Sequence, residues 1–233
     1  MPIKIFFDGA SLKDMLFFYQ NDPRISGFTT NPTLMRQAGI NHYETFAREV
    51  VRKISDLPVS FEVFSDKLSE METQAKKIAS WGDNVYVKIP ITNTESISTI
   101  PIIKSLSAAG IKLNVTAVFT IHQVEEVVEN IDGQTPIIIS VFAGRIANAG
   151  IDPVPIVANA VKHASNKPHC EILWASTREA YNIVQAEKTG CHIITLTRSL
   201  LDAANNFGKS LSDFSLETVK MFYQDALSAG YEL

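Results

Sequence analysis

Short apolar runs alternate along this chain with longer segments in which apolar residues recur every three or four positions. The short runs have the length and composition of buried β-strands, and the longer segments have the period of amphipathic helices. Strands are predicted at residues 3–7, 26–29, 59–64, 85–90, 112–119, 136–142, 169–174 and 192–196. Helices are predicted at 11–19, 42–54, 66–80, 94–108, 120–130 and 153–164, from beyond Arg178 to 188, and at 199–206.

This order predicts eight consecutive βα units, with no linker or change of composition between them. Strands that alternate with helices indicate a parallel sheet, and eight units favour a single (β/α)8 TIM barrel domain over residues 1–233. A doubly wound sheet is the alternative, because one sequence does not reveal strand order. A further helical pattern at 215–229 predicts a C-terminal extra helix. We expect it to pack on its own barrel or, preferably, on a neighbouring subunit of a homo-oligomer.

The bulk properties narrow the class of protein. A chain of 233 residues with 45% hydrophobic and 20% charged residues is expected to be globular. Its net charge of −4 offers no basic surface for nucleic acid or an anionic membrane, and neither partner is predicted. Cys170 and Cys191 lack metal-ligand spacing and are expected to be reduced thiols. No apolar run is long enough for a membrane helix and no targeting segment is recognised, so we expect a cytoplasmic protein.

The strand at 85–90 contains a lysine within an apolar run. Lys88 and Tyr86 alternate with aliphatic residues, so both point to one face of the sheet. Pro90 cannot donate to a strand ladder, which places Lys88 at the C-terminal end of the strand. Catalytic residues of parallel α/β barrels gather at this end. A lysine there can also extend its ammonium group to solvent, so the strand alone leaves both readings open.

Nearly every strand has polar residues at its C-terminal end, and they occupy the alternate positions that share one face of the sheet. A packed barrel interior would have Val, Ile or Leu at these positions. A single such residue could be a solvated strand end or a helix cap, but a ring of them indicates a pocket. The ring consists of Asp8, Asn31, Glu62, Lys88, Asn114, Thr116, Ser140 and Ser176.

A buried lysine beside two carboxylates suits Schiff-base chemistry. Desolvation moves the pKa of an amine from about 10.4 toward about 7–8, and the neutral amine can attack a carbonyl. The protonated imine of a ketose withdraws electrons, so the adjacent C–C bond can break and leave an enamine for a new aldehyde to capture. Asp8 and Glu62 are the carboxylates available as base and as acid/base relay.

Two arginines follow neighbouring strands and suggest an anion site. Arg145 comes directly after Gly144, and Arg178 comes after Ser176 and Thr177. Guanidinium groups with a hydroxyl group and helix N-termini suit a phosphate monoester, although either arginine could instead form a structural salt bridge. Because the sixth and seventh strands are adjacent in a barrel, the two side chains can converge. The expected substrate is a sugar phosphate.

Six runs of this sequence resemble the transaldolase family, and in particular the short transaldolase and fructose-6-phosphate aldolase-like group. They occur in the family's order between Asp8 and about Leu196. The runs are Thr29-Thr30-Asn31-Pro32-Thr33, Phe61-Glu62-Val63, Val87-Lys88-Ile89-Pro90, Asn114-Val115-Thr116-Ala117-Val118-Phe119, Gly144-Arg145-Ile146 and Ala175-Ser176-Thr177-Arg178.

The resemblance implies a class I, metal-free enzyme without a cofactor, in which Lys88 forms a Schiff base with a dihydroxyacetone unit. It implies that Asp8 is the acid/base at the hydroxyl of the cleaved bond, and that Glu62 and Thr116 hold and activate the catalytic water. The family reaction moves a ketol unit from sedoheptulose 7-phosphate to glyceraldehyde 3-phosphate, yielding erythrose 4-phosphate and fructose 6-phosphate, within the pentose phosphate pathway. The implied substrate-binding residues are Asn31, Asn114 and Ser140 at the hydroxyls, Phe142, and Arg145, Ser176 and Arg178 at the phosphate.

Two residues bear on the branch of the family. Aldolase-type members, which release dihydroxyacetone, typically carry Gln where Glu62 stands and Tyr where Phe142 stands, so the transferase is favoured. Aldolase-type cleavage and transfer on a related phosphosugar are the alternatives. The sequence departs from the family's pattern at Gly9-Ala10-Ser11, at Asn148, where an Asp is common, and at Thr197-Arg198, where a proline is usual. A non-catalytic phosphosugar-binding barrel would be expected to lack one of the central groups, and all of them are present.

Overall fold

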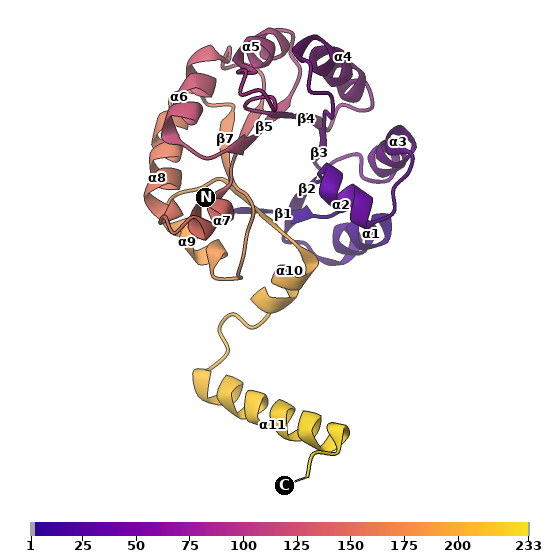
Figure 1. The fold of residues 1–233 in the computed structure, drawn as a ribbon, viewed down its shortest axis with the longest axis vertical. Coiled ribbons are helices and arrows are strands. Elements are labelled where there is room, and N and C mark those ends of the chain that lie inside the picture. The colour runs from indigo at the N-terminus through magenta and orange to yellow at the C-terminus, as the bar shows by residue number, and fades with distance from the viewer. Residues whose placement is uncertain (1–2, 233) are drawn as a thin grey trace.

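The structure, a computed structural model that describes residues 3–232, is a closed barrel of eight parallel strands surrounded by helices (Figure 1). Each strand pairs with the next, and β8 pairs with β1. The predicted TIM barrel is therefore confirmed, and the doubly wound sheet was the wrong alternative. The strands are β1 (Lys4–Asp8), β2 (Ile25–Thr29), β3 (Val59–Glu62), β4 (Val85–Pro90), β5 (Leu113–Val118), β6 (Ile137–Val141), β7 (Cys170–Trp174) and β8 (Ile193–Leu196).

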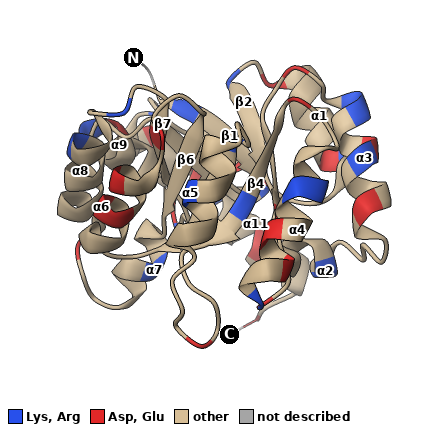
Figure 2. Ribbon diagram, turned by 90° about the horizontal axis from the view of Figure 1, so that it is seen from above, with Lys and Arg blue, Asp and Glu red and all other residues tan. Residues whose placement is uncertain are grey.

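Eight helices cover the outside of the barrel, and two six-residue helices follow strand ends. The covering helices are α1 (Leu12–Asn21), α3 (Tyr43–Lys53), α4 (Leu68–Ala79), α5 (Ile100–Ala108), α6 (Ile121–Asn130), α8 (Pro153–Ala164), α9 (Asn182–Lys188) and α10 (Arg198–Ala204). The short ones are α2 (Pro32–Gln37) after β2 and α7 (Ala143–Asn148) after β6. Basic and acidic residues are interspersed on α3 and α4, which carry several ion pairs (Figure 2).

The structure corrects the predicted helix at 94–108, because α5 begins only at Ile100. Pro101 explains the difference, since a proline fits the first turn of a helix and breaks its interior. Residues 91–99 instead form a loop in which Thr92 and Ser98 make an antiparallel bridge. The short helix α2 was not predicted, although Asn31 and Pro32 form a regular helix start, with a side-chain cap followed by proline.

Side chains along each strand point alternately outward and inward, so the protein has one apolar core under the helices and another inside the barrel. Side chains on the outward phase, such as Val87 and Ile89 of β4, are fully buried under the helices. On the inward phase, Phe6, Ile138, Leu173, Ala175 and Ile193 form a separate cluster inside the barrel. Phe6 and Ile138 precede Asp8 and Ser140 by two residues, so this apolar layer lies directly beneath the polar layer at the C-terminal strand ends.

The last helix, α11 (Leu211–Ala229), lies apart from the barrel (Figure 1). It begins four residues earlier than the predicted start, because Ser210 caps it by accepting a hydrogen bond from Asp213 N. Gly230 ends it in the left-handed conformation, at φ 66°. None of its residues is buried. The chain thus presents an ordered helix whose apolar side chains contact no core of its own.

The packing of the outer core predicts that two isoleucines of the fourth βα unit contribute differently to the free energy of unfolding. Ile103 on α5 is fully buried (0% exposed), whereas Ile97 in the preceding loop is 47% exposed. Ile103→Ala should lower the free energy of unfolding by about 2–5 kcal/mol, because it leaves a cavity. Ile97→Ala should change it by no more than about 0.5 kcal/mol. Urea unfolding of both variants tests this, and equal effects would contradict the packing described.

Candidate active site

Lys88 extends from β4 into the barrel and is only 6% exposed. Its Nζ donates a hydrogen bond to the backbone oxygen of Thr30 (2.8 Å) and lies 3.1 Å from Glu62 Oε2. The pairing of β3 with β4 sets Glu62 directly opposite Lys88, so backbone register creates this ion pair. The ammonium group is therefore held inside the barrel and does not extend to solvent.

Asp8 reaches the same interior from β1. Its Oδ1 accepts a hydrogen bond from Thr29 Oγ1 (2.8 Å), and Thr29 also shares a hydrogen bond with Thr195. Burial raises the pKa of Asp8 above the ordinary carboxyl range, while the positive charge of Lys88 and the Thr29 hydrogen bond oppose this rise. Asp8 and Glu62 thus differ in environment, with Glu62 paired to the lysine and Asp8 hydrogen-bonded to a hydroxyl.

A buried amide joins three strands beside the lysine. Asn114 on β5 donates from Nδ2 to Ser60 Oγ on β3 (3.0 Å), and its Oδ1 accepts from Ser140 Oγ on β6 (2.7 Å). Lys88 and Asn114 are directly paired across β4 and β5. The network fixes the orientation of the Asn114 amide, because both of its ends have partners.

Thr116 differs from its neighbours because its hydroxyl is unpaired. Its Oγ1 is buried and makes no hydrogen bond with any atom of residues 3–232. Buried hydroxyl groups normally have a partner, so this one is free to bind water or substrate. The next residue, Ala117, has a φ of 57°, and the pairing of β5 with β6 shifts register between Val115 and Val118. This irregularity marks Thr116 as part of a locally strained strand end, which is common at functional sites.

Arg145 on α7 and Arg178 after β7 lie exposed at the barrel rim. Within residues 3–232, the arginines that form ion pairs are Arg24, Arg48 and Arg198. Neither Arg145 nor Arg178 therefore has a carboxylate partner in the described part of the chain, which argues against structural salt bridges there. Both guanidinium groups remain available to an anion.

Backbone packing brings the two arginine-bearing segments together. A Cβ atom on Gly144 would lie 1.7 Å from the backbone oxygen of Ser176, so only glycine permits this approach. Ser176 itself has a φ of 64°, in the left-handed region that non-glycine residues seldom occupy. The start of α7 and the turn after β7 are thus pressed against each other, and this contact places both arginines on one side of the barrel mouth.

Two candidates have structural roles as well. Asn31 caps α2, because its Oδ1 accepts a hydrogen bond from Leu34 N (3.0 Å). Phe142 lies against Phe119, with ring centroids 5.7 Å apart, and beneath the guanidinium of Arg145. Neither role prevents contact with a substrate, since both residues are only partly buried at strand ends.

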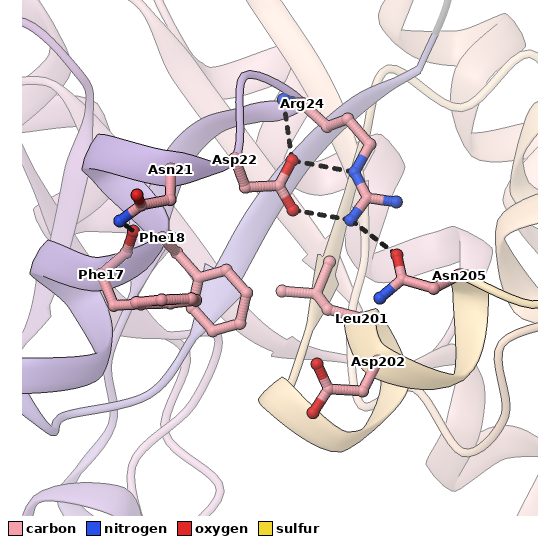
Figure 3. Close-up of a pocket in the computed structure, with 8 residues that line it drawn as sticks. All are labelled: Phe17, Phe18, Asn21, Asp22, Arg24, Leu201, Asp202 and Asn205. Atoms are coloured by element: carbon pink, nitrogen blue, oxygen red, sulfur yellow. Dashed lines mark hydrogen bonds and ion pairs between the residues drawn. The ribbon is translucent and has the colours of Figure 1, made fainter.

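A groove of about 500 Å³ opens beside Asp8, between the turn after β1, helix α2 and the start of α10. Two departures from the family pattern, the Gly9-Ala10-Ser11 turn and Thr197-Arg198, line it. A second cavity of about 290 Å³ lies between α1 and α10, outside the barrel (Figure 3). No candidate site residue lines this second cavity, whose apolar lining residues are Phe17, Phe18 and Leu201.

Several residues that contact the site were not predicted from the sequence. Thr29 and Ser60 stand two positions before Asn31 and Glu62, so the alternating phase could have identified them. Thr30 holds Lys88 through its backbone oxygen, which leaves no trace in a side-chain pattern. Asn148 contacts Arg178, a contact that depends on how α7 packs.

The remaining sequence expectations concern residues outside this site. Both cysteines are buried and unbonded, and burial raises the pKa of each thiol to about 12, so neither is a ready nucleophile. In residues 3–232, no three His, Cys, Asp or Glu side chains come together as a metal site. No helix in the same range is long and apolar enough to cross a membrane.

Fold and site together define a (β/α)8 barrel whose mouth gathers a buried lysine, two carboxylates and two arginines that have no carboxylate partner among residues 3–232. Comparison with known proteins agrees. The family profile described as Transaldolase/Fructose-6-phosphate aldolase matches residues 5–232. The chain belongs to this family, as the six sequence runs indicated, and it is a transaldolase-like enzyme.

Individual relatives match most of this chain. The chain is 36% identical over 203 residues to a "Probable transaldolase" of Nitrosopumilus maritimus (strain SCM1), and the alignment covers 86% of each protein. It is 34% identical over 199 residues to "Probable transaldolase 2" of Listeria monocytogenes serovar 1/2a (strain ATCC BAA-679 / EGD-e), with 85% of this chain and 86% of that protein covered.

The environment of Asp8 predicts a pH-dependent effect on stability. Because the pKa of Asp8 is raised in the folded protein, its contribution to stability is full below the unfolded value of about 3.9 and is lost as pH rises through the folded value. Ionised Asp8 therefore destabilises the fold at pH 7. Asp8→Asn should raise the free energy of unfolding at pH 7, and the gain should shrink below about pH 4.

Chemical unfolding at several pH values measures this gain, and Asp83→Asn, at an exposed position, is the matched control. A gain at Asp8 that does not change with pH, or a loss of stability at pH 7, would contradict the assigned environment.

Proposed function

We propose that the protein transfers a dihydroxyacetone unit between sugar phosphates through a Schiff base on Lys88, as in the reaction of sedoheptulose 7-phosphate with glyceraldehyde 3-phosphate. The observation that carries this proposal is the position of Lys88 Nζ. It is buried in the barrel, 3.1 Å from Glu62 Oε2, with Asp8 close enough for its carboxyl group to respond to the lysine charge.

The first step is attack of the neutral Lys88 amine on the C2 carbonyl of the ketose. The resulting carbinolamine loses water to become an imine, and this loss needs a proton donor at the departing hydroxyl. Glu62 lies beside Nζ and can relay the proton. The unpaired Thr116 hydroxyl can hold the water that leaves and later returns.

Cleavage follows at the C3–C4 bond. Asp8 removes the proton of the C4 hydroxyl, the C4–O electrons form the new aldehyde carbonyl, and the bonding pair moves to the iminium to give an enamine. A carboxyl group with a raised pKa suits this role, because it can take up the proton and return it. When the acceptor aldehyde arrives, the enamine carbon attacks it, Asp8 protonates the new alkoxide and water hydrolyses the imine.

The rest of the site would orient the substrate. The Asn114 network presents hydroxyl and amide groups beside Lys88, where the donor hydroxyls would lie. Asn31 is the other candidate for these contacts. At the rim, Arg145, Ser176 and Arg178 would bind the phosphate of the donor and of the acceptor. Binding the phosphate at the rim would hold the reacting carbon atoms at the same position beside Lys88 through both half-reactions.

Reductive trapping tests the Schiff base directly. Borohydride with fructose 6-phosphate should leave a three-carbon adduct on Lys88, located by peptide mass mapping. Lys88→Met should lower turnover by about a thousandfold or more, because no other group forms the imine. Lys104→Met, at an exposed position on α5, is the matched control and should retain turnover.

The same assay separates transfer from cleavage. Turnover only with erythrose 4-phosphate present identifies the transferase. Dihydroxyacetone released without an acceptor identifies the aldolase branch. Retained turnover in Lys88→Met would refute the Schiff base, and wild-type protein with neither adduct nor turnover would indicate another phosphosugar or a non-catalytic barrel.

We also propose that the protein is a homo-oligomer held together by α11. Eight large apolar residues of this helix are exposed, and a lone helix of this kind is marginal in water unless it packs on a partner. A second copy of the chain is the favoured partner, since exchange of a terminal helix between identical subunits closes symmetrically. The cavity between α1 and α10, whose lining includes Phe17, Phe18 and Leu201, would be the surface on that copy that receives the helix (Figure 3).

Substitutions at two nearby positions on different faces of α11 test this role in assembly. Phe222→Glu puts a charge on the apolar face, where the side chain is 61% exposed in the single chain, and should shift the protein toward the monomer. Gln224→Glu adds the same charge on the polar side, near Glu217 and Lys220, and should not. Sedimentation velocity measures both. A wild-type monomer at micromolar concentration, or an unchanged assembly in Phe222→Glu, would refute this role of α11.

A further inference from the structure

Three side chains from β1, β2 and β8 form a short hydrogen-bonded row inside the barrel. Asp8 Oδ1 accepts a hydrogen bond from Thr29 Oγ1 at 2.8 Å, and Thr29 Oγ1 lies 2.5 Å from Thr195 Oγ1. Strand pairing sets Thr29 on β2 directly opposite Asp8 on β1, and β8 pairs with the other edge of β1. Both threonines are buried, at 3% and 4% exposure. The row is therefore fixed by the sheet and shielded from bulk water.

The space beneath the two hydroxyl groups is filled by apolar side chains. Phe6 and Ile193 belong to the apolar cluster inside the barrel, and Ile193 precedes Thr195 by two residues. Gly27 precedes Thr29 by two residues, and a Cβ atom there would lie 2.5 Å from the ring of Phe6. In such low-polarity surroundings a hydrogen bond to a carboxylate is stronger than it is in water.

The number of protons available fixes the direction of the row. An ionised carboxylate only accepts hydrogen bonds, so Thr29 uses its single proton toward Asp8. The bond between the two hydroxyl groups then requires the proton of Thr195, and Thr29 accepts it. A hydroxyl group that accepts one hydrogen bond donates a stronger one, because the two bonds polarise each other. Thr195 therefore strengthens the bond from Thr29 to Asp8.

This row makes the two carboxyl oxygens of Asp8 unequal. Oδ1 has the Thr29 hydroxyl as its donor, whereas no hydrogen bond from within residues 3–232 reaches Oδ2. Asp8 also lines the groove of about 500 Å³ at the barrel mouth, so a substrate hydroxyl can approach its carboxyl group from there. A proton on Oδ2 leaves the Thr29 bond intact, whereas a proton on Oδ1 competes with it.

We propose that Thr29, oriented by Thr195, is a positioning residue that holds Oδ1 of Asp8 and leaves Oδ2 to exchange the proton with the substrate hydroxyl. The inference rests on the proposed function for the hydroxyl concerned, which is the one at C4. The proton moves from this hydroxyl to Oδ2 during cleavage, and it returns from Oδ2 to the new alkoxide after the acceptor is captured. Oδ1 keeps the same donor at both stages, so the carboxyl group does not have to turn between the two half-reactions.

The charged groups around Asp8 stay in place when Thr29 is replaced. Burial raises the pKa of Asp8, the positive charge of Lys88 and the Thr29 hydrogen bond oppose this rise, and the negative charge of Glu62 adds to it. The other charged residues that line the groove beside Asp8 are Asp14, Arg198 and Asp202. Because a substitution of Thr29 alters none of these charges, a changed titration of Asp8 reports the loss of the hydrogen bond.

The decisive variants are Thr29→Val, which removes the hydroxyl group and keeps the shape, and Thr29→Ser, which keeps the hydroxyl group. NMR of isotope-labelled aspartate carboxyl carbons over a pH series, without substrate, gives the acid dissociation constant of Asp8, and Asp8→Asn identifies its signal. Thr29→Val should lower this constant about tenfold, because a hydrogen bond to the ionised form is lost. Thr195→Val should lower it about twofold through a weaker Thr29 bond, and Thr29→Ser should leave it near the wild-type value.

Turnover in the proposed reaction should follow the same titration. The acid limb of the profile of kcat against pH should move to higher pH by about one pH unit in Thr29→Val and should stay in place in Thr29→Ser. A merely structural role of Thr29 would lower kcat without moving this limb. Thr135→Val is the matched control, because it removes a buried hydroxyl that donates to the backbone oxygen of Ser107 just before β6, and it should change neither quantity.

The titration and the turnover assay can each overturn the inference. The hold on Oδ1 is refuted by an Asp8 titration that is unchanged in Thr29→Val or that moves equally in Thr29→Ser. A titration that moves while the kcat limb stays in place would overturn the part of Oδ2 in proton exchange. Because the titration needs no turnover, the two proposals fail separately. A protein without a Lys88 adduct in which Thr29→Val still moves the Asp8 titration would refute the proposed reaction and support the hold on Oδ1.

Discussion

The buried ammonium group of Lys88 is the constraint on which the site depends. A charge inside a barrel is tolerated only if it is paired and hydrogen-bonded, because desolvation otherwise costs several kcal/mol. Glu62 and the Thr30 carbonyl supply these partners, and both come from backbone positions fixed by strand pairing. The same register also sets Asn114 beside the lysine. The polar layer is thus arranged by the geometry of the sheet, and the carboxylate that stabilises the lysine is also placed to exchange protons with it.

The barrel and the inward position of its central polar residues could be predicted from the sequence because both follow from alternation. Period-two phase identified Lys88, Glu62 and Asp8 as inward-facing, and the order of βα units gave the barrel. Contacts made by the backbone could not be predicted in this way. The Thr30 carbonyl, the left-handed turn at Ser176 and the contact between Asn148 and Arg178 all depend on three-dimensional packing. The start of α5 was misplaced because helical period was weighted above the position of Pro101.

The charged residues at the mouth of the barrel form two groups on different sides of the opening. Toward β1, β3 and β4, opposite charges lie together in the interior, where low polarity strengthens each interaction and makes proton affinity sensitive to its neighbours. Toward β6 and β7, Arg145 and Arg178 lie exposed at the rim without a carboxylate partner in the described part of the chain, and solvent stabilises their charges. In the proposed reaction, proton transfer and anion binding would thus occupy different sides of one opening, so a substitution could alter either property without removing the other.

The apolar layer of Phe6, Ile138, Leu173, Ala175 and Ile193 closes the barrel below the polar ring, so the site has a single entrance. In the proposed transfer, the aldehyde released from the donor must leave through the opening by which the acceptor enters. Because donor and acceptor would place their phosphates at the same rim residues, the released aldehyde has to leave before the acceptor binds, and the proposed transfer should follow ping-pong kinetics. The enamine has to persist while the released aldehyde leaves and the acceptor enters. Protection of its nucleophilic carbon from protonation is therefore as important to transfer as the cleavage itself.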